Sequence, residues 1–165
     1  MGKAIIVTGT PGTGKTTLTK LLMDKGYSTI DVGSRIKEEK LYDFYDNKMQ
    51  SFVIDDDKLN NYLINIIENN TNINKLIIEG HVVRLPPQFV SHCIVLRCSI
   101  RNLRQRLVER NYSESKIDEN VEAEIMEVIL SDMLLLYGEN NVFVISTDGT
   151  VEESLDRLLN LLKEF

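Results

Sequence analysis

The stretch GTPGTGKTT, residues 9 to 17, contains the residue types that bind phosphate groups, in the spacing G-x-x-x-x-G-K-[ST]. Lys15 can offer its charge to the β- and γ-phosphates of a nucleoside triphosphate, and the hydroxyl group of Thr16 is suited to a Mg²⁺ ion. The stretch follows an apolar run and precedes a helical pattern, so its backbone N–H groups can point at phosphate oxygens where a helix N-terminus favours anions. We therefore expect ATP to bind with Mg²⁺, at Gly12, Thr13, Gly14, Lys15, Thr16 and Thr17.

An acidic residue and a histidine follow a second apolar run, in LIIEGHVV (76–83). If this strand lies beside the strand that precedes the phosphate loop, Glu79 can reach the metal ion bound by Thr16, through a water molecule. A carboxylate at this position could instead cap a helix. His81 could hold an attacking water or a phosphate oxygen, or it could simply bond to the backbone of a turn.

Two arginines, Arg106 and Arg110, are four residues apart in RQRLVERN and share one face of an expected helix. Guanidinium groups in this arrangement could hold a polyphosphate and stabilise charge on the transferred phosphoryl group. The alternative is a solvated helix face on which Glu109 pairs locally.

The segment 33–56 has mixed charge and no clear periodicity, and it reads as an inserted, mainly helical element that binds the phosphate acceptor. Gly33, Arg35 and Lys37 are the candidate acceptor-binding residues. Three aromatic residues could stack on a base or pack in the core, namely Tyr42, Phe44 and Tyr45. Asp55 to Asp57 favour the start of a helix over a metal site.

These residues need a framework that brings distant segments together. Five runs rich in Ile and Val read as strands buried on both faces, and helical patterns separate them. The runs are KAIIVTG, STIDVG, KLIIEG, HCIVLRC and NVFVIST, and the helical patterns include 15–25, 55–70, 101–110, a long one at 118–138 and 150–165. Such alternation predicts a single α/β domain over 1–165 with a parallel sheet covered by helices. Together with the phosphate-loop motif, it leads us to expect a P-loop NTPase fold with three α/β/α layers and the strand order 2-3-1-4-5.

Composition limits the possible partners. The formal net charge is −6 and the pI is about 5.0, which argues against a general nucleic-acid surface and suits a basic protein partner better. No apolar run approaches the ~20 residues of a membrane span, so we expect a cytoplasmic protein. Cys93 and Cys98 are five residues apart on an expected strand and should lie on opposite faces as reduced, buried thiols.

Several stretches together resemble the adenylate kinase isoenzyme 6 (Fap7-type) family of nucleoside monophosphate kinases, in order and spacing over nearly the whole chain. They are GTPGTGKTT, DVGSRIKEEKLYDFYD, IIEGH, VLRCSIRNLRQRLVERNYSESKIDENVEAEI and DGTVEESLDRLL. The resemblance implies transfer of the ATP γ-phosphoryl group to AMP and a role of His81 in hydrolysis. It also implies a short lid at about 109–119, and an adenine site bordered by the loop from Thr147 in which Gly149 allows close approach. The family's pattern after the lid falls on Tyr112, Lys116, Asn120 and Glu124.

Two positions depart from the family pattern. Glu79 stands where the family often has aspartate, and Lys37 stands where larger adenylate kinases have an arginine that binds the acceptor phosphate with two hydrogen bonds. Arg35 or Arg84 could supply the missing guanidinium group.

Three functions are compatible with these observations. The first is an adenylate kinase with intrinsic ATPase activity. The second, also implied by the resemblance, is an ATPase switch in small ribosomal subunit maturation that binds a basic ribosomal protein. The third is a small-metabolite kinase of similar architecture, such as a shikimate kinase.

Overall fold

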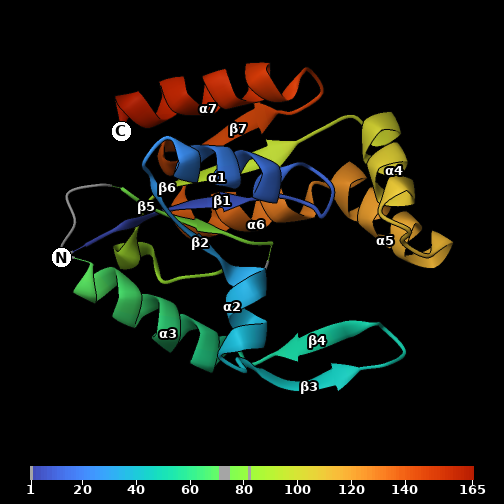
Figure 1. Ribbon diagram of the computed structural model, residues 1–165, viewed down its shortest axis with the longest axis horizontal. Helices are drawn as coiled ribbons and strands as arrows, with labels where there is room; N and C mark the ends of the chain where they lie inside the picture. The colour runs from blue at the N-terminus through green and yellow to red at the C-terminus, as the bar shows by residue number, and fades with distance from the viewer. Residues whose placement is uncertain (1, 71–74, 82) are drawn as a thin grey trace.

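A parallel sheet forms the centre of the protein. The structure, a computed structural model, describes residues 2–70, 75–81 and 83–165 (Figure 1). Within these residues the main sheet has five strands, and its order confirms the predicted 2-3-1-4-5 arrangement. From one edge to the other the strands are β2 (Ser28–Asp31), β5 (Leu76–Glu79), β1 (Ala4–Thr8), β6 (Val90–Arg97) and β7 (Val142–Ser146).

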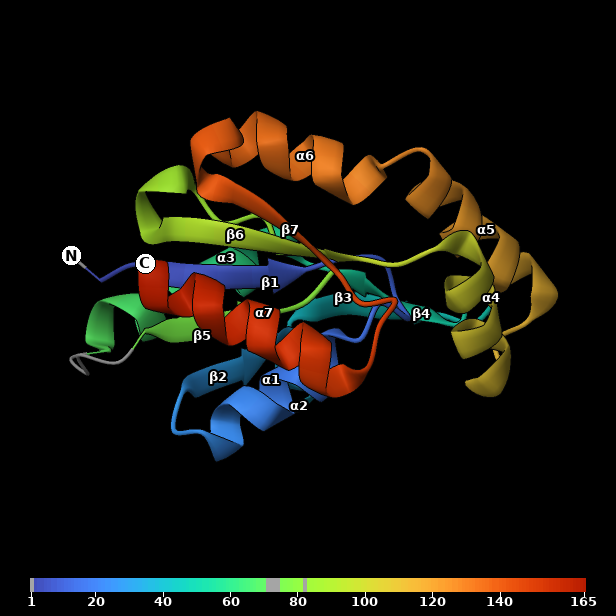
Figure 2. The same ribbon diagram turned by 90° about the horizontal axis from the view of Figure 1, so that it is seen from above.

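Helices cover both faces of this sheet, which makes the three predicted layers (Figure 2). α1 (Lys15–Asp24) and α7 (Val151–Glu164) pack on one face, and α3 (Asp56–Asn69) and α6 (Val128–Tyr137) pack on the other. Successive side chains of β1 point alternately to these two faces, as they do in any β-strand. All of β1 and β5 is buried, which explains their uninterrupted apolar sequences.

A smaller helical pair lies beyond the carboxyl ends of the strands. α4 (Ile100–Glu109) and α5 (Glu114–Ile125) pack on each other through Leu103, Leu107, Ile117 and Val121.

The two cysteines belong to different clusters, Cys93 under α6 and Cys98 beside α4, and both are buried free thiols as predicted.

The single long helix predicted over 118–138 is wrong. α5 ends at Ile125 and α6 begins at Val128, with Glu127 between them in the left-handed region at φ 54°. α5 packs on α4 while α6 packs on the sheet, so the chain must change direction between two surfaces. The sequence hides this turn because apolar residues continue through it without a glycine or proline.

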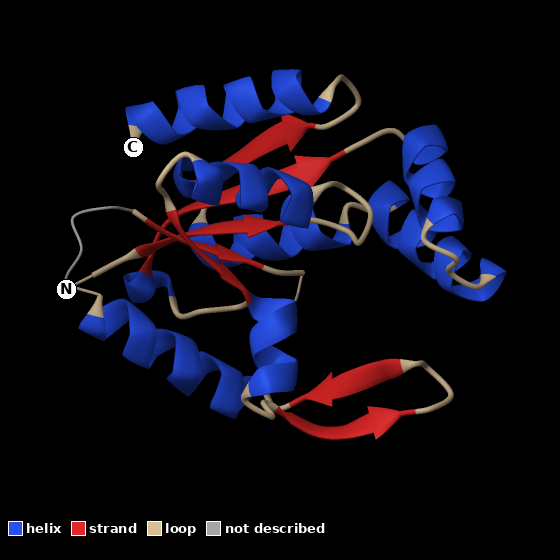
Figure 3. Ribbon diagram, in the orientation of Figure 1, coloured by secondary structure: helices blue, strands red, loops and turns tan. Residues whose placement is uncertain are grey.

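The inserted segment after β2 is helical only at its start. α2 (Val32–Glu38) is followed by an antiparallel hairpin of β3 (Tyr42–Asp46) and β4 (Ser51–Ile54), which projects from the body in Figure 3. The carboxylate of Asp46 accepts hydrogen bonds from the backbone N–H groups of Lys48 and Met49, which stabilises the turn.

The aromatic residues of the hairpin have mixed environments. The rings of Tyr42 and Phe52 lie 4.5 Å apart and pack against the core, and Tyr45 contacts the edge of Phe52 at 5.1 Å. Phe44 is 57% exposed. Asp55 caps the N-terminus of α3 by accepting a hydrogen bond from the N–H of Lys58, as expected for this acidic run.

The remaining elements lie at the amino ends of the strands, away from the phosphate loop. Two short 3₁₀ helices, Pro87–Phe89 and Glu139–Asn141, precede β6 and β7. The His92 ring stacks on Phe165 at 3.7 Å, which fits a structural role for this histidine. None of the helices in the described part of the chain has both the length and the apolar character that crossing a membrane requires.

Candidate active site

The phosphate loop joins the end of β1 to the start of α1, at the centre of the sheet. Gly12 and Gly14 have φ values of 96° and 94°, which L-residues with side chains rarely adopt. A Cβ atom at Gly12 would also lie 3.0 Å from Leu103 and 3.1 Å from Leu107. Glycine is therefore needed at Gly12 both for backbone conformation and for close packing of the loop on α4.

Lys15 is held against the loop itself. Its Nζ donates hydrogen bonds to the carbonyl oxygens of Gly9, at 2.6 Å, and Thr10, at 3.1 Å, and the residue is 7% exposed. Burial lowers the pKa of Lys15 to about 8, although the negative charge of Glu79 acts in the opposite direction. Lys15 therefore carries a charge near neutral pH in a site that already fixes its position.

Thr16 and Glu79 meet because β5 pairs with β1, with Val7 opposite Glu79. The Thr16 hydroxyl donates a hydrogen bond to Glu79 Oε1 at 3.3 Å. Glu79 is buried, and its Oε2 has no hydrogen-bond partner among the described residues. Burial raises the pKa of this carboxyl group, and the neighbouring Asp31 raises it further.

A divalent cation fits these two oxygen donors. A buried carboxylate oxygen without a partner is costly, and a bound cation would remove that cost. No group of three or more His, Cys, Asp or Glu side chains that could hold a metal occurs within residues 2–70, 75–81 and 83–165. The donors present instead match the way Mg²⁺ is commonly bound, by one or two protein oxygens together with phosphate oxygens and water.

His81 lies in the turn after β5, two residues beyond Glu79, and keeps an exposed side. Desolvation by nearby protein atoms lowers its pKa to about 4, and the positive charges of Lys15 and Lys116 add to this effect. The imidazole is therefore neutral at physiological pH, and one of its nitrogens can accept a hydrogen bond.

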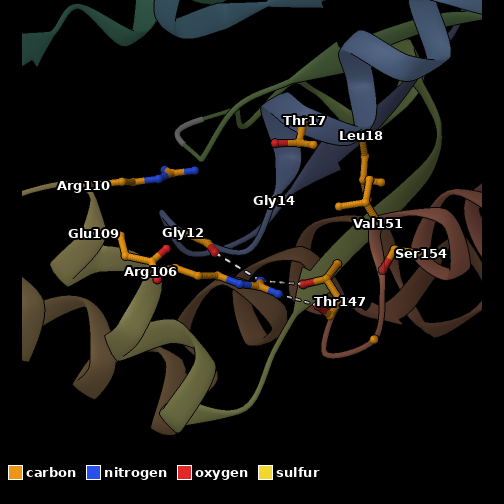
Figure 4. Close-up of a pocket in the computed structure, with 11 residues that line it drawn as sticks. Gly12, Gly14, Thr17, Leu18, Arg106, Glu109, Arg110, Thr147, Val151 and Ser154 are labelled. Atoms are coloured by element: carbon orange, nitrogen blue, oxygen red, sulfur yellow. Dashed lines mark hydrogen bonds between the residues drawn. The ribbon is translucent and has the colours of Figure 1, made fainter.

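Arg106 ties two loops together (Figure 4). Its guanidinium group donates to the Gly12 carbonyl oxygen at 3.3 Å, to Thr147 Oγ1 at 3.1 Å and to the Thr147 carbonyl oxygen at 2.6 Å. Thr147 Oγ1 in turn donates to the Thr13 carbonyl oxygen at 2.8 Å. Arg106 thus holds the phosphate loop to the β7–α7 loop, and direct contact between Arg106 and a phosphate stays a prediction.

The guanidinium group of Arg110, one turn further along, forms no hydrogen bond or ion pair within the described chain, and it lies on the other side of Gly12 in Figure 4. It is close enough to Lys15 to lower the pKa of that amine. Glu109 pairs locally, by accepting a hydrogen bond from Gln105 at 3.1 Å, and leaves Arg110 available for a ligand.

A cavity lies where α1, α4 and the β7–α7 loop meet. Its walls bring together several predicted nucleotide-binding residues from distant segments. The lining residues are Gly12, Gly14, Thr17, Leu18, Arg106, Glu109, Arg110, Thr147, Gly149, Val151 and Ser154. Apolar side chains on one wall and the phosphate loop on another suit a ligand with a flat ring and a charged tail.

Gly149 has a structural role that the sequence did not indicate. A Cβ atom there would meet Glu153 Oε2 at 2.1 Å. That carboxylate accepts a hydrogen bond from the Thr150 N–H at 2.9 Å, and Thr150 Oγ1 accepts one from the Glu153 N–H. The small residue leaves room for this capping box at the start of α7. Contact between Gly149 and a nucleotide stays a prediction.

The candidate acceptor residues on α2 are not gathered around this cavity. Arg35 forms an ion pair with Glu38 of the same helix at 3.1 Å, and Lys37 is exposed. Arg84, the other possible substitute, pairs with Asp132 of α6 at 2.7 Å. Gly33 lies in the first turn of α2, where the Asp31 carboxylate caps the helix.

Arg97 and Glu124 are site residues for which sequence reasoning assigned no chemistry. Arg97 ends β6 and Glu124 lies on α5, and the two side chains form an ion pair at 2.8 Å beside the phosphate loop. A charged residue inside the apolar run HCIVLRC was the signal that could have indicated Arg97.

Known proteins of similar sequence identify the family of this chain. A family model described as "AAA domain" matches residues 5–127. A Methanocaldococcus jannaschii protein named "Putative adenylate kinase" is 38% identical over 162 residues, which cover 96% of this chain and 85% of the relative. The "Adenylate kinase isoenzyme 6 homolog" of Caenorhabditis elegans is 34% identical over 165 residues, which cover 98% and 90%. The chain belongs to the adenylate kinase isoenzyme 6 family.

Membership of the adenylate kinase isoenzyme 6 family confirms the resemblance found in the sequence and makes the chain a P-loop protein of the nucleotide kinase type. A solved structure of shikimate kinase from Bacteroides thetaiotaomicron is 18% identical, with a TM-score of 0.56 and 99% of each chain covered. At that identity the likeness shows the fold alone.

Proposed function

We propose that this protein transfers the γ-phosphoryl group of ATP to AMP, which yields two molecules of ADP, in the presence of Mg²⁺. The observation that carries the proposal is the meeting of Lys15, Thr16 and the buried Glu79 carboxylate next to the cavity between α1, α4 and the β7–α7 loop. Relatives named as adenylate kinases support the choice of donor and acceptor.

Each donor-side residue has a defined part in this reaction. Thr16 Oγ1 and Glu79 would hold Mg²⁺, which neutralises charge on the β- and γ-phosphates when bound. Lys15 would exchange its carbonyl partners for phosphate oxygens, and the positive charge of Arg110 would stabilise the transferred group. Arg106 fixes the positions of the two loops on either side of the cavity relative to each other.

The acceptor side requires a rearrangement. AMP would bind between α2 and the hairpin on one side and the end of β5 on the other, with Lys37 facing its phosphate. Arg35 could join Lys37 only after release of Glu38, which costs little because the pair is exposed. The turn between α4 and α5, within the predicted lid at 109–119, would then close over both phosphates and exclude water.

A second candidate is favoured by a specific observation: a neutral His81 lies near Lys15 and Lys116, while Arg35 and Arg84 are already paired. A water molecule bonded to His81 would be a ready acceptor. The protein would then be an ATPase switch that binds a basic protein of the small ribosomal subunit, and the net charge of −6 is compatible with such a partner.

The deciding experiment measures ADP formed from Mg-ATP alone and with AMP, CMP, UMP, GMP or shikimate. Lys15→Ala serves to detect contaminating kinase, and Lys25→Ala, an exposed residue after α1, serves as its matched control. Two ADP formed per ATP consumed, with AMP only, is the expected result. Slow ADP release that no monophosphate accelerates would favour the ATPase switch, and phosphorylation of shikimate alone would revive the metabolite kinase.

A further inference from the structure

A buried carboxylate of α5 contacts the phosphate loop from outside the nucleotide cavity. Glu124 is 3% exposed. One of its oxygens, Oε2, accepts a hydrogen bond from the hydroxyl group of Thr10, and the other, Oε1, accepts one from Arg97 Nε at 2.8 Å. A charge this deeply enclosed is tolerated only when hydrogen-bonded partners satisfy it.

Several hydrogen bonds of the phosphate loop involve Thr10. Its carbonyl oxygen accepts hydrogen bonds from the Thr13 N–H at 3.2 Å, the Thr13 hydroxyl at 2.7 Å and Lys15 Nζ at 3.1 Å. Its own side chain donates to Glu124 and is 2% exposed. The hydrogen bond to Glu124 therefore fixes the residue whose carbonyl group orients Lys15.

Arg97 anchors Glu124 to the sheet. Its guanidinium group donates to Glu124 Oε1 and, at 2.9 Å, to the carbonyl oxygen of Glu124, and it also donates to the carboxylate of Glu127. Glu127 is the left-handed residue between α5 and α6. The change in helix direction thus allows two carboxylates to reach one arginine at the end of β6.

We infer that Glu124 is a positioning residue for the phosphate loop, which couples the location of α5, and hence of the turn before it, to the geometry of Thr10 and Lys15. This deepens the proposed function and rests on it only for the assignment of a nucleoside triphosphate to the loop. Closure of the α4–α5 turn would be transmitted through α5 to Thr10, and a correctly placed Thr10 would in turn favour closure.

The same helix offers a matched control. Glu122 of α5 is exposed and lies outside the predicted lid at 109–119. Residues two positions apart point to different sides of a helix, so Glu122 does not share the direction of Glu124. Glu122→Gln makes the same chemical change as Glu124→Gln and therefore tests the general effect of removing an acidic residue from α5.

The test measures the Kd of the full chain for Mg-AMPPNP, an ATP analogue that is not turned over, well below the melting temperature of each variant. Glu124→Gln and Thr10→Val are each expected to raise Kd roughly 10-fold, since each removes a charge-assisted hydrogen bond. The double variant should bind no more weakly than either single one, because both changes break one connection. Glu122→Gln should match the parent protein.

Hydrogen exchange separates positioning from general destabilisation. In the free protein, amide protection of residues 9–14 should fall in Glu124→Gln and stay unchanged in Glu122→Gln. A Kd within twofold of the parent for Glu124→Gln, or strictly additive effects in the double variant, would overturn the inference.

A further pair keeps the inference testable if Glu124→Gln does not fold. Thr10→Ser retains the hydroxyl donor and should bind Mg-AMPPNP like the parent, whereas Thr10→Val should not; equal affinities would refute the role of the hydrogen bond. Lack of AMP phosphorylation would refute the proposed kinase activity and leave these comparisons valid. Failure of the parent protein to bind AMPPNP would overturn both.

Discussion

The two halves of the site differ in how far they are organised before any substrate binds. On the donor side, Lys15, Thr16 and Glu79 are buried or half-buried and joined by hydrogen bonds to one another and to the loop. On the acceptor side, Lys37 is exposed and Arg35 is paired within its own helix. Under the proposed function, the donor half would be largely assembled before ATP binds, whereas the charges of the acceptor half would still have to be brought together.

Location in the fold explains this difference. The phosphate loop leaves the central strand of a sheet buried on both faces, so packing fixes its position. The acceptor segment begins at an edge strand and continues into a hairpin that extends from the body (Figure 3). Substitutions on the donor side should therefore change the rate strongly, and those on the acceptor side should change mainly the affinity for the acceptor.

The largest effect is expected for Glu79→Gln, which removes the charge that would hold Mg²⁺. ATP turnover should fall roughly 100-fold or more, because metal stabilisation of the phosphates is lost. Measurement of rate against Mg²⁺ concentration checks this, with Glu68→Gln, an exposed residue of α3, as control.

The same variant should gain stability. Burial raises the pKa of Glu79, so above the ordinary carboxyl pKa the folded state bears the cost of the charged form, and glutamine avoids that cost. A lower melting temperature together with an unchanged Mg²⁺ requirement would contradict the assignment of Glu79 to the metal.

A smaller effect is expected for His81→Gln. ATP hydrolysis without an acceptor should fall roughly 10-fold, less than the about 100-fold or more of a full general acid–base contribution, because His81 would only orient the water. The Kd for Mg-AMPPNP should stay within about twofold. His92→Gln at the far end of the sheet is the control for activity.

Acid titration adds an independent readout for His81. Its pKa is lowered from 6.5 to about 4, so between these values the unfolded chain binds more protons than the folded one. The free energy of unfolding should therefore decrease as pH falls from 6.5 toward 4, and less steeply in His81→Gln. Identical slopes in parent and variant, with unchanged hydrolysis, would restore a purely structural role.

The smallest effect, and the one that sharpens the contrast most, is expected for Lys37→Arg. A guanidinium group can bind the AMP phosphate with two hydrogen bonds, so KM for AMP should decrease about three- to tenfold while KM for ATP is unchanged. Initial rates at varied AMP and fixed ATP measure this, with Lys25→Arg as control. A change in KM for ATP instead would place Lys37 on the donor side.

Local sequence patterns predicted the five strands of the main sheet and the phosphate loop, because each depends on neighbouring residues and on hydrophobic periodicity. The strand order followed from the fold that the phosphate-loop motif implies. The contacts that organise the site were less accessible. Thr10 and Glu124 are 114 positions apart, and Arg106 and Gly12 are 94 apart, so no short pattern contains both partners. Arg106 shows the consequence: its spacing indicated a phosphate ligand, while the fold also uses it to hold two loops.

The hairpin and the break between α5 and α6 escaped prediction for a different reason. Both depend on which surface a segment packs against. The apolar pattern around Glu127 is compatible with one helix on a single surface and equally with two helices on different surfaces.

The stacking of Phe165 on His92 places the carboxyl end of the chain at the edge of the sheet opposite the phosphate loop, and the amino end lies on that same side (Figure 1). Either end can therefore be attached through a flexible linker to a solid support or a fluorescent label without covering the nucleotide cavity. Opening and closing of the α4–α5 turn could then be followed on single immobilised molecules, with one dye at an end and a second on that turn.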